Sequence, residues 1–269
     1  MTRAMERTAT RSIVAGLATL AVLTANAPAQ QGNAPAAADI LAASDRVRNP
    51  DQAFRLTNTL IEYVKGQPRN RVVLAIYARE DKGTRQFSNL VRYVDPPRDA
   101  GKMVLLNAPT LWFYDPASKA SIRISPQQRL IGQASNADVL TVNLARDYAA
   151  KLVGEETLQD ADRKERDCWH LDMAAATPDA LYSRVELWIE RGTYRSVKGK
   201  FYSDSGRLLK IAYYRKYELQ LGAVRPTETI IIDAVDSNLV TTVTSSAYRF
   251  QAIPDAWFQR DFLPRLKAD

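Results

Sequence analysis

Cys168 and His170 have the most obvious capacity for covalent chemistry, because each is the only residue of its type in the chain. A thiolate beside an imidazole is a nucleophile with its general base. The two residues lie two positions apart, so on a β-strand both would point to the same face, about 6.5–7 Å from each other. That spacing exceeds hydrogen-bonding distance unless the side chains lean together. The pattern therefore favours a buried thiol and imidazole over a catalytic pair.

The other polar residues show no pattern typical of a metal or cofactor site. One histidine and one cysteine cannot complete a zinc site, and the carboxylates lack the spacing of a calcium-binding loop. The pairs Asp160 and Asp162, and Asp233 and Asp236, fit turns and surface positions. Glycine-rich phosphate loops and the Gly-x-Ser-x-Gly nucleophile motif are absent. We therefore expect no enzyme, no metal and no cofactor.

The first 29 residues have the pattern of a cleaved signal peptide. Three arginines precede an apolar run at residues 13–23, and A-x-A cleavage signals end at Ala27 or Ala29. The run is too short to cross a hydrocarbon core of roughly 30 Å. No cysteine near it could carry a lipid. We expect a soluble periplasmic protein with a linker at 30–37 and a single domain at 38–269.

Composition limits the partners. The formal net charge is +7, from 37 basic and 30 acidic residues, but the basic residues are scattered rather than clustered. Such a distribution is not typical of a nucleic-acid surface, so no nucleic-acid partner is expected. An apolar fraction of 46% can supply a large core. Because Cys168 has no second cysteine to pair with in the chain, this core has to hold the domain together without an internal disulfide.

The elements that position these residues are mostly strands. Long runs of alternating apolar and polar residues, separated by short turns, predict antiparallel neighbours in a meander. We expect about 10–12 strands, in a barrel or a strongly curled sheet. Helical spacing or capping residues predict short helices at 36–47, 125–131, 136–144 and 254–262, of which the two central ones would cover one face of the sheet as a lid.

Alternation also sorts the two faces of the sheet. On the strand at 182–190, Val185, Leu187 and Ile189 share an apolar face. On the strand at 207–219, Leu209, Ile211, Tyr213, Tyr217 and Leu219 form the apolar face, and Lys210 falls on the wet face. A sheet this large has more apolar surface than short helices can cover. Either side chains fill the interior as a packed core, or a hydrophobic cavity remains.

Several segments, in this order, resemble the outer-membrane lipoprotein-sorting family, which includes LolA-like periplasmic lipoprotein and lipid carriers. No single segment is specific, but their order and spacing together cover most of the chain after residue 37. The matching segments are RYVDPP at 92–97, LWFYDP at 111–116, IRI at 122–124, GQASNAD at 132–138, LVGEE at 152–156 and SGRLLK at 205–210.

The resemblance implies a mainly β (α+β) half-barrel whose concave face is covered by short helices and holds a lipid or lipoprotein acyl chain. It implies an inner-membrane exporter and an outer-membrane acceptor as partners. In the carriers an arginine holds the lid shut, and Arg85, Arg92 and Arg123 are candidates here. The alternative is a sensor of lipid or envelope state that regulates a membrane partner. For the cavity lining we predict aromatic residues: Tyr77, Phe87, Trp112, Tyr114 and Tyr213.

Overall fold

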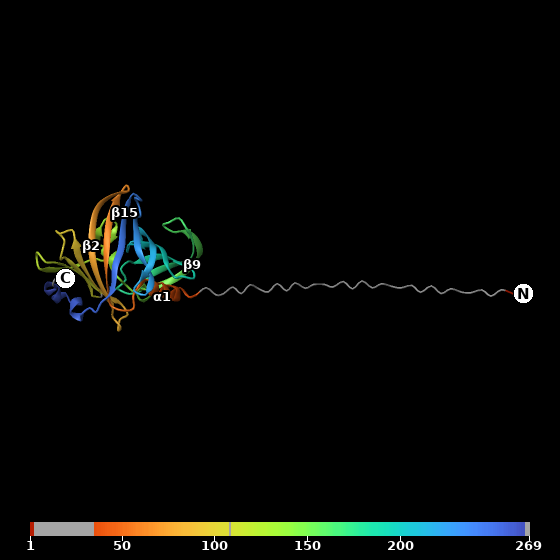
Figure 1. Ribbon diagram of the computed structural model, residues 1–269, viewed down its shortest axis with the longest axis horizontal. Coiled ribbons are helices and arrows are strands. Elements are labelled where there is room, and N and C mark those ends of the chain that lie inside the picture. Colours follow the sequence, from red (N-terminus) through yellow and green to blue (C-terminus); the bar gives the residue numbers. More distant parts are fainter. Residues whose placement is uncertain (3–34, 108, 267–269) are drawn as a thin grey trace. The chain divides into compact units, whose positions relative to one another are not determined.

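The fold is built on one antiparallel sheet that curls around an apolar interior (Figure 1). The computed structural model describes residues 1–2, 35–107 and 109–266. Apart from Met1 and Thr2, the expected signal peptide lies outside the described residues, as does the linker up to residue 34. Pro35–Asp269 forms one compact unit.

The sheet has thirteen strands in the described part of the chain, slightly more than the 10–12 expected. Each pairs antiparallel with its neighbours, and β6 and β9 form the two edges, so the sheet is open, as a half-barrel requires. In spatial order the strands are β6 (Ala120–Ile124), β5 (Thr110–Asp115), β4 (Met103–Asn107), β3 (Phe87–Asp95), β2 (Gln67–Glu80), β1 (Phe54–Val64), β15 (Leu239–Phe250), β14 (Ala223–Asp233), β13 (Leu208–Gln220), β12 (Ser196–Tyr202), β11 (Arg184–Glu190), β10 (Glu165–Ala175) and β9 (Tyr148–Gln159).

The pairing of β1 with β15 joins two meanders into this one sheet. We call this pairing the seam. Strands β1–β6 lie in order on one side of the seam, and strands β15–β9 lie in order on the other side. Leu60 lies opposite Val243 across the seam, and both side chains are buried in the main core. A register shift between Arg55 and Thr57 marks a bulge, where Ala247 of β15 has a positive φ of 50°. A bulge increases local twist, which helps the sheet curl.

Helix α1 (Ala37–Arg48) covers part of the concave face, and its bounds agree within one residue with the helix expected at 36–47. Its residues Ile40 and Leu41 are 0% and 1% exposed and belong to the main core. The next residues, Asn49 and Pro50, end the helix because a residue before proline is pushed out of the helical region. Among the helices of the described residues, none combines the length and apolar character needed to cross a membrane.

The lid differs from the two helices expected at 125–131 and 136–144. Its first part is a small hairpin of β7 (Arg129–Ile131) and β8 (Ala134–Ser135), closed at Gly132, which has a φ of +53°. The second part is a single 3₁₀ turn, η1 (Asn136–Val139), followed by extended backbone and the short α2 (Leu144–Asp147). The helix prediction is wrong here because contacts with the sheet, rather than local propensity, satisfy the backbone. For example, the backbone N–H of Thr141 donates to the side-chain oxygen of Asn89 on β3, and the backbone oxygen of Thr141 accepts from the side-chain nitrogen of Asn89.

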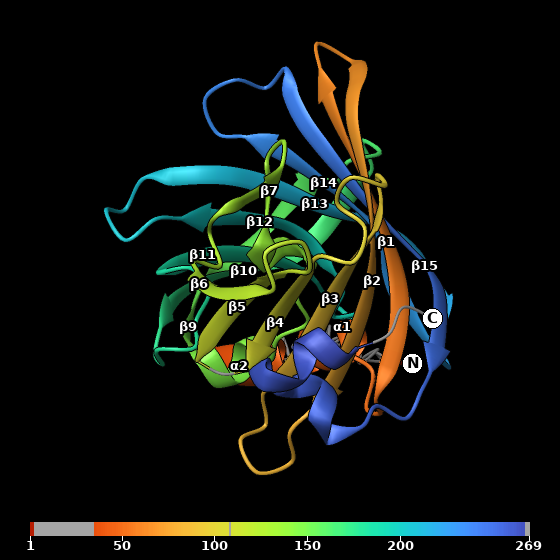
Figure 2. The same cartoon turned by 90° about the vertical axis from the view of Figure 1, so that its left-hand side faces the viewer.

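The C-terminal segment forms a second core on the outer face of the sheet. Two 3₁₀ helices, η2 (Asp255–Phe258) and η3 (Arg260–Arg265), replace the single helix expected at 254–262. Figure 2 shows them in front of β3 and β4, with α1 behind the same strands. Trp257 packs edge-on against Tyr77, with ring centroids 5.2 Å apart. Leu263 is completely buried in this outer cluster.

This arrangement predicts that the outer cluster contributes to stability independently of the interior. Leu263→Ala should lower the free energy of unfolding by roughly 2–5 kcal/mol, because it removes buried methyl groups and leaves a cavity. Urea unfolding measures the change. Leu219→Ala serves as the control, since Leu219 is 72% exposed and its truncation should stay within about 0.5 kcal/mol. Equal effects of the two substitutions would contradict the assignment of Leu263 to a core.

Candidate functional site

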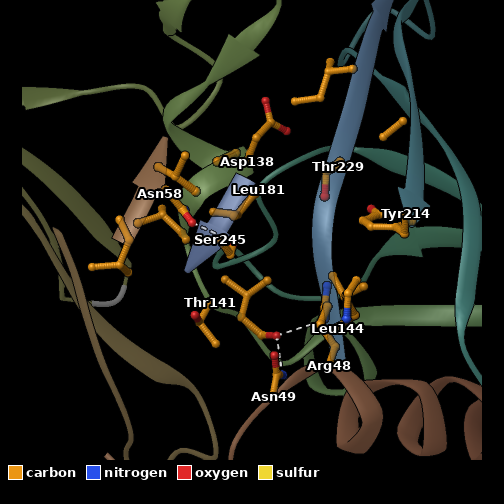
Figure 3. A pocket seen from close by; sticks show the side chains of 18 of the residues that line it. Arg48, Asn49, Asn58, Asp138, Thr141, Leu144, Leu181, Tyr214, Thr229 and Ser245 are labelled. Atoms are coloured by element: carbon orange, nitrogen blue, oxygen red, sulfur yellow. Dashed lines mark hydrogen bonds between the residues drawn. The ribbon is translucent and has the colours of Figure 1, made fainter. Parts of the chain in front are cut away.

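The candidate site is an apolar cavity of about 180 Å³ between the concave face of the sheet and the lid (Figure 3). Both halves of the sheet contribute to it. Leu56 and Ile76 come from one side of the seam, and Leu187, Ala212 and Ile231 come from the other. The lid closes the cavity with apolar residues of the segment after β8: Ala137, Val139 and Val142. The apolar part of this lining suits a hydrocarbon ligand.

Polar side chains also line the cavity, and several of them are held in place by hydrogen bonds. Asn58 and Ser245 face each other across the seam and share a hydrogen bond of 2.7 Å. Tyr214 also lines the cavity, and burial raises its pKa to about 12. Burial likewise raises the pKa of Tyr148 to about 12, and its hydroxyl donates to the backbone oxygen of Tyr182 at 3.0 Å. These hydroxyls are therefore neutral at physiological pH.

Four residues, Ser135, Asp138, Tyr182 and Lys210, form a buried polar cluster that we call the latch. Lys210 of β13 makes an ion pair with Asp138 and donates to the Ser135 hydroxyl at 3.1 Å. The Tyr182 hydroxyl bonds Ser135 at 2.8 Å and Asp138 at 3.1 Å. Burial, together with the charge of Asp138, raises the pKa of Tyr182 well above its usual value. The latch thus ties η1 to the far half of the sheet.

The Lys210 side chain is only 5% exposed, which corrects its expected place on the wet face of β13. Its even-numbered neighbours Ala212 and Tyr214 line the cavity, so the even positions face inward. The alternation on this strand predicted the wrong inner face, because Lys210 and Tyr214 were counted as polar residues. A lysine can nevertheless be buried when a carboxylate pairs with it, and its ammonium also lies 5.1 Å from the centre of the Tyr182 ring.

A second set of contacts holds the base of the lid. The backbone oxygen of Val142 accepts hydrogen bonds from Arg48 and Asn49, both at 2.9 Å, as seen at the bottom of Figure 3. Arg48 and Lys210 therefore both bond the lid. Of the arginines expected in this role, Arg85 pairs with Glu80 and Arg123 donates to Thr110.

The hairpin end of the lid docks on the seam of the sheet. The backbone N–H of Gln133 donates to the Thr241 hydroxyl of β15 at 2.7 Å. A Cβ added to Gly132 would collide with that hydroxyl and would lie 3.0 Å from a side-chain carbon of Glu62 on β1. Only glycine combines the positive φ with such a close approach. The lid is thus anchored at the seam, at the latch and at the C-terminal end of α1, in addition to its bonds with Asn89 of β3.

The structure places the five aromatic residues predicted for the cavity elsewhere. Tyr77, Trp112 and Tyr114 pack in the outer cluster beneath the C-terminal segment. Tyr213 faces outward as well, opposite Lys198, whose ammonium lies 5.8 Å from its ring centre. Phe87 does belong to the main core, yet it is not among the cavity-lining residues. The expected inward orientation of Tyr77, Trp112, Tyr114 and Tyr213 is therefore corrected. For the first three, the C-terminal helices provide the apolar cover that the rings require.

Cys168 and His170 lie outside the cavity, and Cys168 is buried in a small apolar cluster with Trp188 and Val197. His170 stacks on Trp188 with ring centroids 4.2 Å apart. Its Nδ1 is 3.3 Å from Glu156 and its Nε2 is 3.4 Å from Glu186, so both nitrogens face carboxylates. Burial raises the pKa of the Cys168 thiol to about 12. Within the described part of the chain, no group of three or more His, Cys, Asp or Glu side chains is placed to hold a metal ion.

Comparisons with known proteins agree on the fold. A protein-family model described as "Uncharacterized protein" matches residues 85–265, more than half of the chain. A LolA superfamily protein from Nitrosomonas europaea has 28% sequence identity and a TM-score of 0.75, over 85% of this chain and all of its own. A putative outer membrane lipoprotein-sorting protein domain from Vibrio parahaemolyticus has 19% identity and a TM-score of 0.71, over 85% of this chain and 98% of its own.

A protein of the DUF1329 family from Desulfovibrio piger has 20% identity and a TM-score of 0.71, over 84% of this chain and 97% of its own. At these identities the Vibrio and Desulfovibrio structures show a shared fold and nothing more. No curated protein matches the chain.

The docking of the lid on the seam predicts a specific effect of Gly132→Ala. The added methyl group should push the hairpin off Thr241, so hydrogen exchange of the amides at residues 129–139 should accelerate while the sheet stays protected. Gly192→Ala is a matched control, because Gly192 also has a positive φ, of 80°, but nothing within 4 Å of an added Cβ. Each variant incurs backbone strain of roughly 1–2 kcal/mol. Equal lid exchange in both variants would contradict the docking.

The buried thiol predicts that Cys168 is inert in the native protein. With a pKa of about 12, about one thiol in 10⁴ is ionised at pH 8, and the side chain is fully buried. Iodoacetamide at pH 8 should leave the native mass unchanged and add one label after unfolding in guanidinium chloride. A Ser205→Cys variant, with its new thiol in an exposed turn, should take up one label while folded. Rapid labelling of native Cys168 would instead support a reactive, catalytic thiol.

Proposed function

The chain belongs to the family whose model matches residues 85–265 and is a LolA-like protein, and from this premise we propose that it is a periplasmic carrier of lipid or lipoprotein acyl chains. In this function the protein takes an acyl chain from one membrane partner, holds it between the curled sheet and the lid, and passes it on. The apolar cavity beneath an anchored lid is the observation that carries the proposal.

Burial alone can supply the affinity. Each methylene group that leaves water contributes about 0.8 kcal/mol. The cavity of about 180 Å³ is smaller than the roughly 300–1,000 Å³ that pockets for drug-sized ligands have. It can therefore hold only a segment of a long acyl chain. Uptake of a whole chain requires the lid to move away from the sheet, which makes the lid anchors part of the function.

The groups in and around the cavity suit binding rather than catalysis. Tyr148 and Tyr214 have pKa values raised by burial, the Ser245 hydroxyl donates to Asn58, and Asp138 is paired with Lys210. A covalent reaction would need an activated nucleophile beside a base. In the proposed function the protein is thus a binding protein and not an enzyme, and neither a cofactor nor a metal takes part.

Burial of apolar surface also governs how the acyl chain is taken up and released. A chain held by several kcal/mol of burial leaves slowly unless a better apolar surface is offered. We therefore assign an inner-membrane exporter as donor and an outer-membrane component as acceptor. The word "lipoprotein-sorting" in the name of the Vibrio structure, together with the export signal expected at residues 1–29, supports this assignment.

Native mass spectrometry tests the proposal directly. The full chain is expressed with its own export signal, purified from the periplasm without detergent and then extracted with organic solvent. A bound mass released as phospholipid or another acyl compound supports the carrier and identifies its cargo. A bare protein that also fails to take up a fluorescent fatty acid contradicts it.

Filling the cavity should abolish binding without unfolding the protein. Ala212→Phe places a ring where Ala212 now lines the cavity, so affinity for a fluorescent long-chain fatty acid should fall roughly tenfold or more. Overpacking costs about 1–3 kcal/mol, which a melting curve monitors. Ala149→Phe, at an exposed position of β9, should bind as the unmodified protein does. Unchanged binding by Ala212→Phe would place the acyl site elsewhere.

A further inference from the structure

A second pocket, of about 220 Å³, lies on the other side of the latch from the acyl cavity. Ser135, Tyr182 and Lys210 of the latch form part of its wall, and Tyr182 lines both spaces. Arg129 of β7 and Arg207, just before β13, complete its cationic lining. We call it the basic pocket. It brings an arginine of the lid together with an arginine and a lysine of the sheet.

The charges of the basic pocket are unbalanced. Arg129 and Arg207 are exposed, and neither forms an ion pair with any residue that the structure describes. The acidic residue in the lining, Asp233, already accepts hydrogen bonds at 2.9 Å from two backbone N–H groups of its own turn. Lys210 is neutralised by Asp138 from the lid side. Three cations (Arg129, Arg207 and Lys210) and two carboxylates (Asp138 and Asp233) leave a net charge of +1 around the basic pocket, which attracts anions.

Lys210 has hydrogen-bonding capacity left for such an anion. Its ammonium has three donors, and within the described residues it donates to Ser135 and Asp138 only. A phosphate group offers several acceptor oxygens and suits arginine forks together with a lysine point charge. The side-chain amides of Gln127 and Gln133, which also line the pocket, are further donors.

We propose that the basic pocket binds a phosphate group and that this binding loosens the lid by competing with Asp138 for Lys210. A phosphate held by the two arginines and Lys210 replaces the carboxylate as partner of the ammonium. Asp138 is then a buried charge without its cation, and this is unfavourable until the lid moves it into water. Because the anion binds the loosened lid better, it shifts the lid equilibrium toward opening. The link to cargo uptake rests on the proposed function, whereas phosphate binding does not.

Calorimetry with two probes tests the site and distinguishes its source. Inorganic phosphate and dihexanoyl phosphatidic acid are titrated into the purified protein at constant ionic strength, since surface electrostatics are screened by salt. Saturable binding of both assigns the site to any phosphate group. Binding of phosphatidic acid alone assigns it to a lipid headgroup. Either result supports the site, and the absence of saturable binding with both probes overturns it.

Variants locate the binding. Arg129→Gln with Arg207→Gln should weaken binding of the phosphate probe roughly tenfold or more, because charged hydrogen bonds are lost. Both side chains are exposed, so the fold should persist. A control double variant, Arg69→Gln with Arg163→Gln, removes the same charge from exposed positions outside the pocket. Equal weakening in both double variants would show a general charge effect and overturn the site.

Hydrogen exchange tests the coupling. The phosphate probe should accelerate amide exchange at residues 129–139 in the unmodified protein and in the control, but not in Arg129→Gln with Arg207→Gln. Phosphate binding with unchanged lid exchange overturns the coupling. Fatty-acid uptake in phosphate-free buffer separates the two hypotheses. If uptake persists while phosphate binding fails, only this inference is lost, and if uptake fails in every protein, the carrier proposal is lost.

Discussion

The pairing of β1 with β15 is the interaction on which the rest of the structure depends. It joins residues that are far apart in sequence, with Asn58 opposite Ser245 and Glu62 opposite Thr241. Two separate half-sheets would each expose an additional edge and an apolar face, which is an aggregation hazard. The same seam carries the polar pair of the cavity, and its residues Thr241 and Glu62 form the surface on which the lid hairpin docks. Cavity and lid are therefore positioned by a single long-range pairing.

Local sequence patterns predicted the elements whose formation depends on neighbouring residues. The meander, the N-terminal helix and the short C-terminal helical segment follow from alternation, turn residues and proline, and the structure contains all three. On β11 the alternation also identified the correct inner face, since Val185 and Leu187 lie in the main core. That strand has apolar residues on one side and charges on the other, so its pattern has one solution.

The site itself depended on contacts that no local pattern contains. On β13 both faces carry tyrosines, and the inward lysine is tolerated only because Asp138 arrives from the lid, 72 residues away in sequence. Tyr77, Trp112 and Tyr114 are apolar enough to line a cavity, but the C-terminal segment covers them from the outside. One signal in the sequence was usable in hindsight: Ser135 and Asp138 have the spacing of a capping box, which marks the start of η1.

The latch also determines how the lid can open. Removing one partner of a buried ion pair costs roughly 3–5 kcal/mol, because the other charge stays dry, whereas hydrating both partners together costs much less. A partial displacement that separates Lys210 from Asp138 within the interior is therefore the least favourable intermediate. About four to six buried methylenes, at about 0.8 kcal/mol each, would be needed to offset it. In the proposed carrier, the lid therefore has to move as a unit that brings Asp138 into water.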